Sequence, residues 1–131
     1  MQNDNFEKFW LHYLREHARP ETRAIHIVGT GAALLLLGSA VVNLAREPHR
    51  RSASPVMLFA SAAVAGYAPA WIGHYFLEGN RPATFKHPLW SLMADLRMTF
   101  LYVTGRLERQ LAFAGVRSDE SRANLARATL H

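Results

Sequence analysis

Two long stretches without formal charge constrain the fold of this chain more than any other feature. Residues 24–45 (AIHIVGTGAALLLLGSAVVNLA) and residues 52–77 (SASPVMLFASAAVAGYAPAWIGHYFL) contain no Asp, Glu, Lys or Arg. As an α-helix, each stretch is long enough to cross a hydrocarbon core of about 30 Å at about 1.5 Å per residue. The polar turn REPHRRSAS (residues 46–54), which overlaps the start of the second stretch and is followed by Pro55, connects them, so we expect the two helices to run antiparallel. The sequence therefore predicts a transmembrane hairpin.

Such a hairpin would place two histidines at nearly the same depth. His26 lies near the start of the first stretch, and His74 lies near the end of the second. Helical rise puts His26 about 29 Å from the connecting loop and His74 about 27 Å from it. Histidine is poorly suited to a membrane interior unless it ligates a metal, relays protons or finds a hydrogen-bonding partner. The depths of the two side chains match, and the sequence leaves open whether they face each other.

A third histidine belongs to an amphipathic helix that we predict over residues 5–17. One face of this helix is apolar and continues into His17; its apolar members are Phe6, Phe9, Trp10, Tyr13 and Leu14. Arg19 precedes Pro20, and a residue before proline disfavours helical geometry, so the helix should end there and allow His17 to approach His26. We predict His17, His26 and His74 as metal ligands. The alternative is that each is a hydrogen-bonded structural group.

The remainder of the chain completes an all-α membrane helical bundle, with amphipathic helices before and after the hairpin. Pro69 should kink the second apolar helix just before His74. After Pro88 an apolar stripe predicts one last helix, which packs on the hairpin or lies in the membrane interface; its members are Leu89, Leu92, Met93, Leu96, Phe100, Val103, Leu107 and Leu111. We expect residues 1–114 to form a single domain and residues 115–131 to be a flexible polar tail.

Composition narrows the chemistry and the partners. The chain has no cysteine, which excludes disulfides, thiolate catalysis and a cysteine zinc site, so imidazole and carboxylate would hold any metal. The net charge of +5 is dispersed among apolar segments, which favours an anionic lipid surface or a fatty-acid carboxylate and disfavours nucleic acid. More basic residues flank the two ends than the connecting loop, which predicts both termini on the cytoplasmic side. Homo-oligomerisation is left open.

Three further polar residues are candidates for roles near the histidines. Glu78 follows His74 by four residues, so it is a candidate metal ligand, a partner that orients His74, or an acid–base group; the alternative is a helix-end charge paired with Arg81. For His87 the simplest role is at the start of the last helix. Asp95 is expected to be structural, paired with Arg97 or with a histidine. Ligand type alone does not choose among Fe, Zn, Cu and Ni.

Two blocks of the sequence resemble the signature of the 2-hydroxy fatty acid dioxygenase family, which includes a fungal enzyme of α-oxidation and short bacterial relatives. The blocks are FWLHYLREHARPETRAIHIVGT and WIGHYFLEGNRPATFKHPLWSLMADLRM, within about residues 6–100. The shared pattern is a histidine, eight residues and His-x-x-Gly, followed by Gly-His-x-x-x-Glu and a basic-Pro-Ala element. The resemblance implies an Fe(2+)-dependent dioxygenase that shortens a 2-hydroxy fatty acid by one carbon, with O2 as co-substrate and His17, His26 and His74 as iron ligands.

We predict an integral membrane protein, in a bacterium one of the inner membrane, whose substrate lays its acyl chain along the apolar hairpin. Glu78 and His87 are the candidate catalytic residues, and Arg23, Asn80 and Arg81 are the candidate substrate-binding residues. Two other functions are compatible with the residues alone. One is a non-catalytic membrane module that uses its histidines for proton relay or helix pairing. The other is a zinc-dependent hydrolase with Glu78 as its base.

Overall fold

The computed structural model describes residues 5–82, 86–116 and 127–129, and within these ranges the fold is all-helical, without strands. A 3-10 turn, Pro48–Arg50, connects the two longest helices, and a π-helix, Gly73–Glu78, continues the second of them. The five α-helices are α1 (Phe6–Glu16), α2 (Pro20–Ala45), α3 (Pro55–Ile72), α4 (Pro88–Val103) and α5 (Leu107–Phe113). The predicted all-α class is confirmed. Most of the predicted tail lies outside the described residues.

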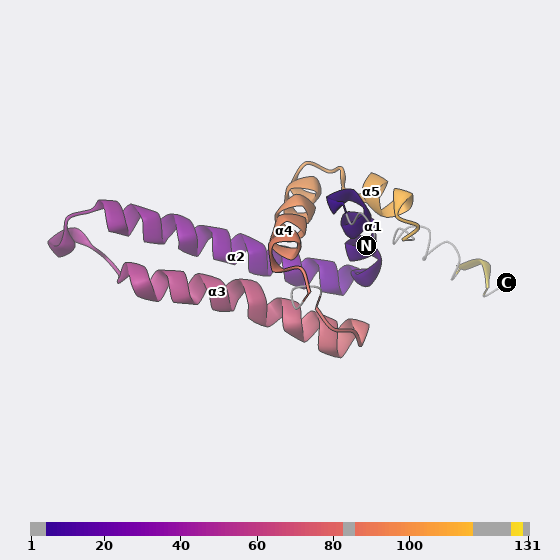
Figure 1. Cartoon of the computed structure of the whole chain (residues 1–131), viewed down its shortest axis with the longest axis horizontal. Coiled ribbons are helices and arrows are strands. Elements are labelled where there is room, and N and C mark those ends of the chain that lie inside the picture. The colour runs from indigo at the N-terminus through magenta and orange to yellow at the C-terminus, as the bar shows by residue number, and fades with distance from the viewer. Residues whose placement is uncertain (1–4, 83–85, 117–126, 130–131) are drawn as a thin grey trace.

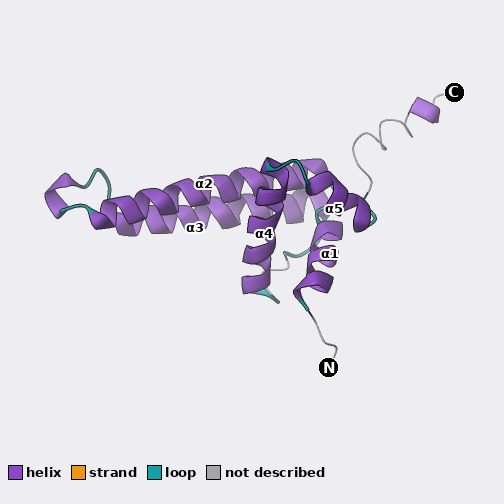
Figure 2. Cartoon of the chain, turned by 90° about the horizontal axis from the view of Figure 1, so that it is seen from above, coloured by secondary structure: helices purple, strands orange, loops and turns teal. Residues whose placement is uncertain are grey.

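Helices α2 and α3 lie side by side along most of their length and run in opposite directions (Figures 1 and 2). Small residues allow this close approach. A Cβ atom added at Gly29 would lie 2.8 Å from the carbonyl oxygen of Ala65, and one added at Gly66 would lie 3.6 Å from the Cβ of Ala33. Pro69 has no N–H to donate to the Ala65 carbonyl, the acceptor one turn earlier. Gly29 therefore packs directly against a helical carbonyl that proline has released.

We expect Gly29→Ala to lower the free energy of unfolding by about 1–3 kcal/mol, because the new methyl group meets a backbone oxygen that cannot move without its helix. The matched control is Gly31→Ala, where nothing lies within 4 Å of the added Cβ. That change should be neutral or stabilise the protein by up to about 1 kcal/mol, since alanine is the better helix former. Urea unfolding in detergent measures both. Equal effects would show that the contact at Gly29 is not tight.

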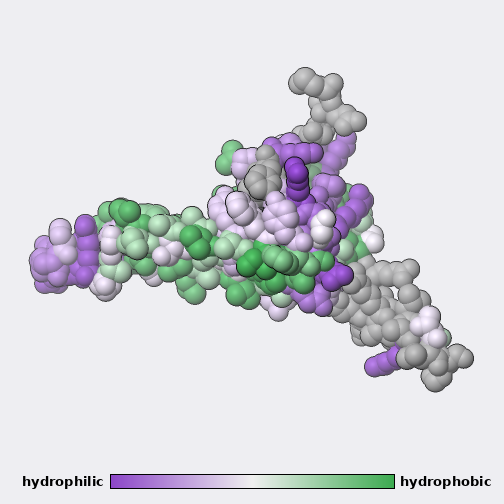
Figure 3. All heavy atoms as spheres, turned by 90° about the horizontal axis from the view of Figure 1, so that it is seen from below, coloured by the Kyte–Doolittle hydropathy of each residue, from purple (hydrophilic) through white to green (hydrophobic). Residues whose placement is uncertain are grey.

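The surface of the α2–α3 pair is mostly apolar and exposed. Only 17% of the residues in the apolar window of each helix are buried, and Leu35 and Val56 are about three-quarters exposed (76% and 75%). Figure 3 shows hydrophobic residues along this arm, with hydrophilic residues at its loop end. Soluble proteins rarely expose contiguous apolar patches of this extent. Both helices are long and apolar enough to cross a membrane, and the crossing itself stays a prediction.

The buried core lies at the other end of the molecule, where α1, α4 and α5 gather (Figures 1 and 2). The predicted apolar face of α1 supplies Phe9, Trp10, Tyr13 and Leu14 to it. Asn5 begins α1, and its side-chain oxygen accepts a hydrogen bond from the backbone N–H of Lys8 at 2.9 Å. The other core residues are Ala94, Met98, Leu107, Leu111, Ala114 and Val116. This core holds α1 and α4 beside the start of α2.

The last predicted helix differs from the observed one in two ways. It is not continuous, because Gly105 adopts a left-handed conformation (φ 70°) that ends α4 and lets α5 start at Leu107. Within α4 the apolar stripe also faces mostly outward: Leu89 and Val103 are 73% and 76% exposed, whereas the small residues Ser91 and Ala94 are buried. The last two members of the stripe, Leu107 and Leu111, belong to α5 and are buried in the core. The prediction of one helix through Leu111 is wrong. Helix α4 packs on α2, where Asp95 meets His26, so the predicted packing on the hairpin is confirmed; a position of the outward stripe in a membrane interface stays a prediction.

Candidate metal centre

The three predicted histidines come together at the end of the α2–α3 pair that lies beside α1. His17 ends α1, His26 lies near the start of α2, and His74 belongs to the π-helix. Their ring centroids are 4.3 Å apart for His17 and His26, 4.5 Å for His17 and His74, and 5.1 Å for His26 and His74. All three side chains are buried, and one nitrogen atom from each lies within 4.8 Å of the others. We call this group the three-histidine cluster.

The π-helix brings His74 to this cluster. Its wider turns depart from α-helical geometry at Gly73, one turn after Pro69, and it ends at Gly79, whose φ is 67°. Gly73 packs closely on α2, because a Cβ added there would lie 3.3 Å from the Cγ2 atom of Thr22. Short π-helical segments occur often at functional sites because they redirect a side chain within a helix. The kink expected at Pro69 stays a prediction; the departure from α-helical geometry before His74 is the π-helix that begins at Gly73.

Each histidine of the cluster donates from its Nδ1 atom to an oxygen. The acceptors are the backbone carbonyl of Tyr13 for His17 (2.7 Å), the Asp95 carboxylate for His26 (2.8 Å) and the side-chain oxygen of Asn80 for His74 (2.6 Å). Carbonyl and carboxylate oxygens only accept, so the proton of each neutral ring is on Nδ1. The three Nε2 atoms are left with free lone pairs. This is the arrangement that metal-binding histidines have in proteins.

The free nitrogen atoms face one another. Nε2 of His17 lies 3.1 Å from Nε2 of His26, and two lone pairs at that separation repel unless a proton or a cation lies between them. Burial, and after it the neighbouring His26 and His74, lower the pKa of His17 well below its usual value, which disfavours the protonated ring. Two nitrogen ligands about 2.1 Å from one metal ion lie about 3 Å apart when their bonds are near a right angle. The residues present therefore fit a metal ion.

Asp95 connects the cluster to α1 and α4. One carboxylate oxygen of this α4 residue accepts hydrogen bonds from His26 and from the hydroxyl group of Tyr13. The ring of Tyr13 also stacks on His17, with 4.0 Å between ring centroids. Burial, and then Asp95, raise the pKa of Tyr13, so its hydroxyl group keeps the proton that it donates. Of the two partners considered for Asp95 the structure has the histidine, and Arg97 pairs instead with Glu7 at 2.8 Å.

The two predicted catalytic residues have partners outside the cluster. Glu78 accepts a hydrogen bond from the backbone N–H of Arg19 at 2.8 Å, at the N-terminus of α2. The ring of His87 stacks on Trp90 and meets the edge of Phe9, with centroids 5.0 and 5.6 Å apart, at the start of α4. Neither side chain joins the group of three within metal-binding distance among the described residues. Their catalytic roles stay predictions.

The predicted substrate-binding residues occupy three different environments. Arg23 is buried, and its guanidinium group donates to the backbone carbonyls of His17 (2.9 Å) and Ala18 (2.8 Å). Asn80 also donates to the backbone carbonyl of Glu16 at 3.4 Å, so it joins the π-helix to the end of α1. Arg81 is exposed. Tyr13 and Asn80 orient histidines, a role that the sequence did not predict for either residue. The available signal for Tyr13 was its position four residues before His17 on one helical face.

Comparison with known proteins identifies the family. No curated protein and no solved structure matches the chain. A family described as 2-hydroxy-palmitic acid dioxygenase Mpo1-like matches residues 3–107. The matched range contains the three-histidine cluster, the acceptors of its Nδ1 protons and helices α1 to α4. Because the match covers most of the chain, the resemblance seen in the two sequence blocks is confirmed, and the protein belongs to the 2-hydroxy-palmitic acid dioxygenase Mpo1-like family.

Proposed function

We propose that this protein is an Fe(II)-dependent dioxygenase that shortens a 2-hydroxy fatty acid by one carbon at the three-histidine cluster. The observation that carries the proposal is the convergence of three buried imidazoles, each tied at Nδ1 to an acceptor oxygen. The description of the family supports the substrate class and the use of oxygen. Three neutral nitrogen ligands suit Fe(II) and leave further positions free. When bound there, iron supplies oxygen activation and a site for the hydroxyl and carboxylate groups of the substrate.

The reaction balances without an added reductant. The bond between the carboxyl carbon and the hydroxyl-bearing carbon breaks, and the carboxyl carbon leaves as carbon dioxide. The hydroxyl-bearing carbon is oxidised to the carboxyl group of a fatty acid one carbon shorter. The four electrons that the substrate loses are those that one O2 molecule accepts, and the products are the shorter acid, carbon dioxide and water. The protein therefore needs only O2 as a co-substrate.

The chain's own residues would orient the reactants. Asp95, Asn80 and the backbone of Tyr13 hold the three rings in one tautomer and one direction. Arg23 and Arg81 come from α2 and from the segment after the π-helix, and their positive charge would favour the approach of a carboxylate. We propose that α2 and α3 span the membrane with both termini on the cytoplasmic side. The exposed apolar surface of this pair supports that placement, and it would let a fatty acid reach the cluster from the lipid.

Metal analysis and an oxygen-dependent assay test this function. We expect the detergent-purified protein to contain iron and to convert 2-hydroxypalmitic acid to pentadecanoic acid in air. The assay should consume one O2 molecule and release one carbon dioxide molecule for each acid formed. No product should form when oxygen is excluded. Zinc in place of iron, or turnover that continues without oxygen, would contradict the proposal and favour the hydrolase alternative.

A further inference from the structure

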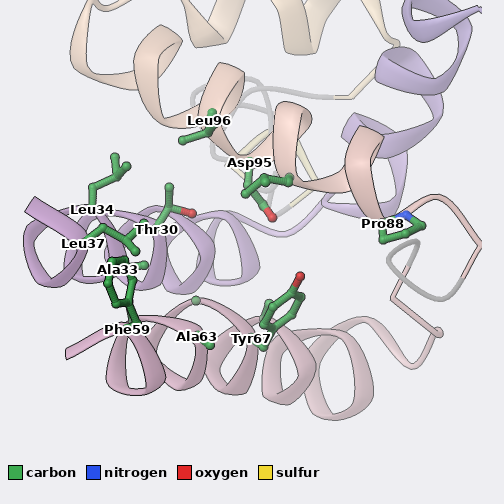
Figure 4. A pocket seen from close by; sticks show the side chains of 14 residues that line it. Thr30, Ala33, Leu34, Leu37, Phe59, Ala63, Tyr67, Pro88, Asp95 and Leu96 are labelled. Carbon is green, nitrogen blue, oxygen red and sulfur yellow. The ribbon is translucent and has the colours of Figure 1, made fainter. Parts of the chain in front are cut away.

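An apolar groove begins one helical turn from the three-histidine cluster. It lies between α2, α3 and α4 and has a volume of about 260 Å³ (Figure 4). Thr30, which lines it, follows His26 by four residues, and Ala70, which also lines it, precedes His74 by four. One turn of helix is about 5.4 Å long. Asp95, the partner of His26, is part of the same wall. One end of the groove, which we call its inner end, is therefore next to the cluster.

The groove changes in character along its length. Asp95 and Tyr67 point toward each other across the inner end, whereas Leu34, Leu37 and Phe59 gather at the other, outer end (Figure 4). Thr30 to Leu37 is about 10 Å along the axis of α2. Leu34 and Phe59 are 47% and 42% exposed, so the outer end opens to the surroundings of the α2–α3 pair. A ligand with a polar head and a long apolar chain matches this sequence of environments.

We propose that the groove holds the acyl chain of the substrate and that its middle, next to Ala63, determines how long a chain the enzyme accepts. This inference rests on the proposed function, because it places the head group at the three-histidine cluster. Small side chains, Ala33, Ala63 and Gly66, leave room along the middle of the groove. The apolar wall makes van der Waals contacts with the chain, and their sum grows with each methylene group that the wall covers. A longer chain therefore gains more from the groove until it passes the outer end.

Position 63 provides a sharp test of chain length. Ala63 precedes His74 by about 16 Å along the helix axis, so a long acyl chain passes it and a short one ends before it. We expect Ala63→Phe to lower kcat/KM for 2-hydroxypalmitic acid by about tenfold or more, and for 2-hydroxyoctanoic acid by less than about twofold. The matched control is Ala68→Phe, an exposed position on the same helix outside the groove. This control should leave both values unchanged.

The results separate the possible errors. Equal losses for the two acids would show that the new ring disturbs the head-group site, and no loss would show that the chain leaves by another route; either overturns the inference. Wild-type protein that converts neither acid would contradict the proposed function instead. In that case the ligand that the groove binds still tests the inference, because binding does not require turnover.

Photo-crosslinking detects directly which ligand the groove binds. A 2-hydroxypalmitic acid analogue with a diazirine at the far end of its chain should label the outer end of the groove, at Leu37 or Phe59. Excess unlabelled 2-hydroxypalmitic acid should remove the label, and Ala63→Phe should weaken it. Labelling elsewhere on the chain would overturn the inference. Displacement by phospholipid but not by the unlabelled acid would also overturn it, because the groove would then hold a bilayer lipid.

Discussion

A His26→Ala/His74→Ala variant will lose its bound iron, with less than about a tenth of the wild-type content remaining after purification. The two changes remove two of the three nitrogen atoms that face the proposed ion and leave only His17 in place. A single imidazole binds a divalent ion too weakly to compete with water and buffer. Oxygen-dependent turnover of 2-hydroxypalmitic acid should fall below detection with the metal. Metal analysis by mass spectrometry measures the first effect, and oxygen uptake measures the second.

A second double variant controls for loss of histidine in general. His12 and His49 are exposed, at 63% and 71%, and each pairs with a nearby carboxylate, Glu16 for His12 and Glu47 for His49. His12→Ala/His49→Ala should keep its iron and its activity. Circular dichroism of both variants checks that the helices still form. Wild-type iron content in a folded His26→Ala/His74→Ala protein would show that the metal binds elsewhere.

Asp95→Leu will weaken Fe(II) binding by about 10–100-fold, the usual effect of removing the carboxylate partner of a metal-bound histidine. Leucine has the same branched arrangement of heavy atoms as aspartate but cannot accept the hydrogen bonds from His26 and Tyr13. The ring of His26 would then lose both its preferred tautomer and its orientation. Asp95→Asn keeps an acceptor oxygen and removes only the charge, so its loss should be smaller. Competition with a chelator gives the affinity of each variant.

Glu7→Gln is the matched control for Asp95, because it weakens the other polar link between α1 and α4. Glu7 accepts from Arg97 at 2.8 Å and 3.4 Å on the surface, away from the histidines. We expect its affinity for Fe(II) to equal that of the wild type. An equal loss in Glu7→Gln and Asp95→Leu would mean that helix placement, and not the orientation of His26, controls the metal. Unchanged affinity in Asp95→Leu would remove Asp95 from the site.

The two long helices and the positions of the three histidines along the chain follow from local sequence patterns. The two charge-free stretches form helices because a helix makes its backbone hydrogen bonds within one segment. Length and composition decide whether a segment can do this in apolar surroundings. Counting along them placed His26 and His74 at one level, since helical rise is nearly constant. The apolar face of α1 identified His17 in the same way. The two blocks that carry the family resemblance contain these positions, so the three candidate ligands can be identified from the sequence alone.

Local sequence patterns do not predict contacts between segments that are distant in the chain. His26 and Asp95 are far apart in the chain, and their hydrogen bond depends on the face that α4 turns toward α2. The apolar stripe of α4 left open whether this helix packs on the hairpin or lies in a membrane interface, and so it did not identify the face that meets α2. The structure turns small residues and Asp95 inward and the stripe outward, an arrangement that suits lipid surroundings. Helical periodicity shows that a helix has two faces, but the packing partner and the solvent determine which of them is buried.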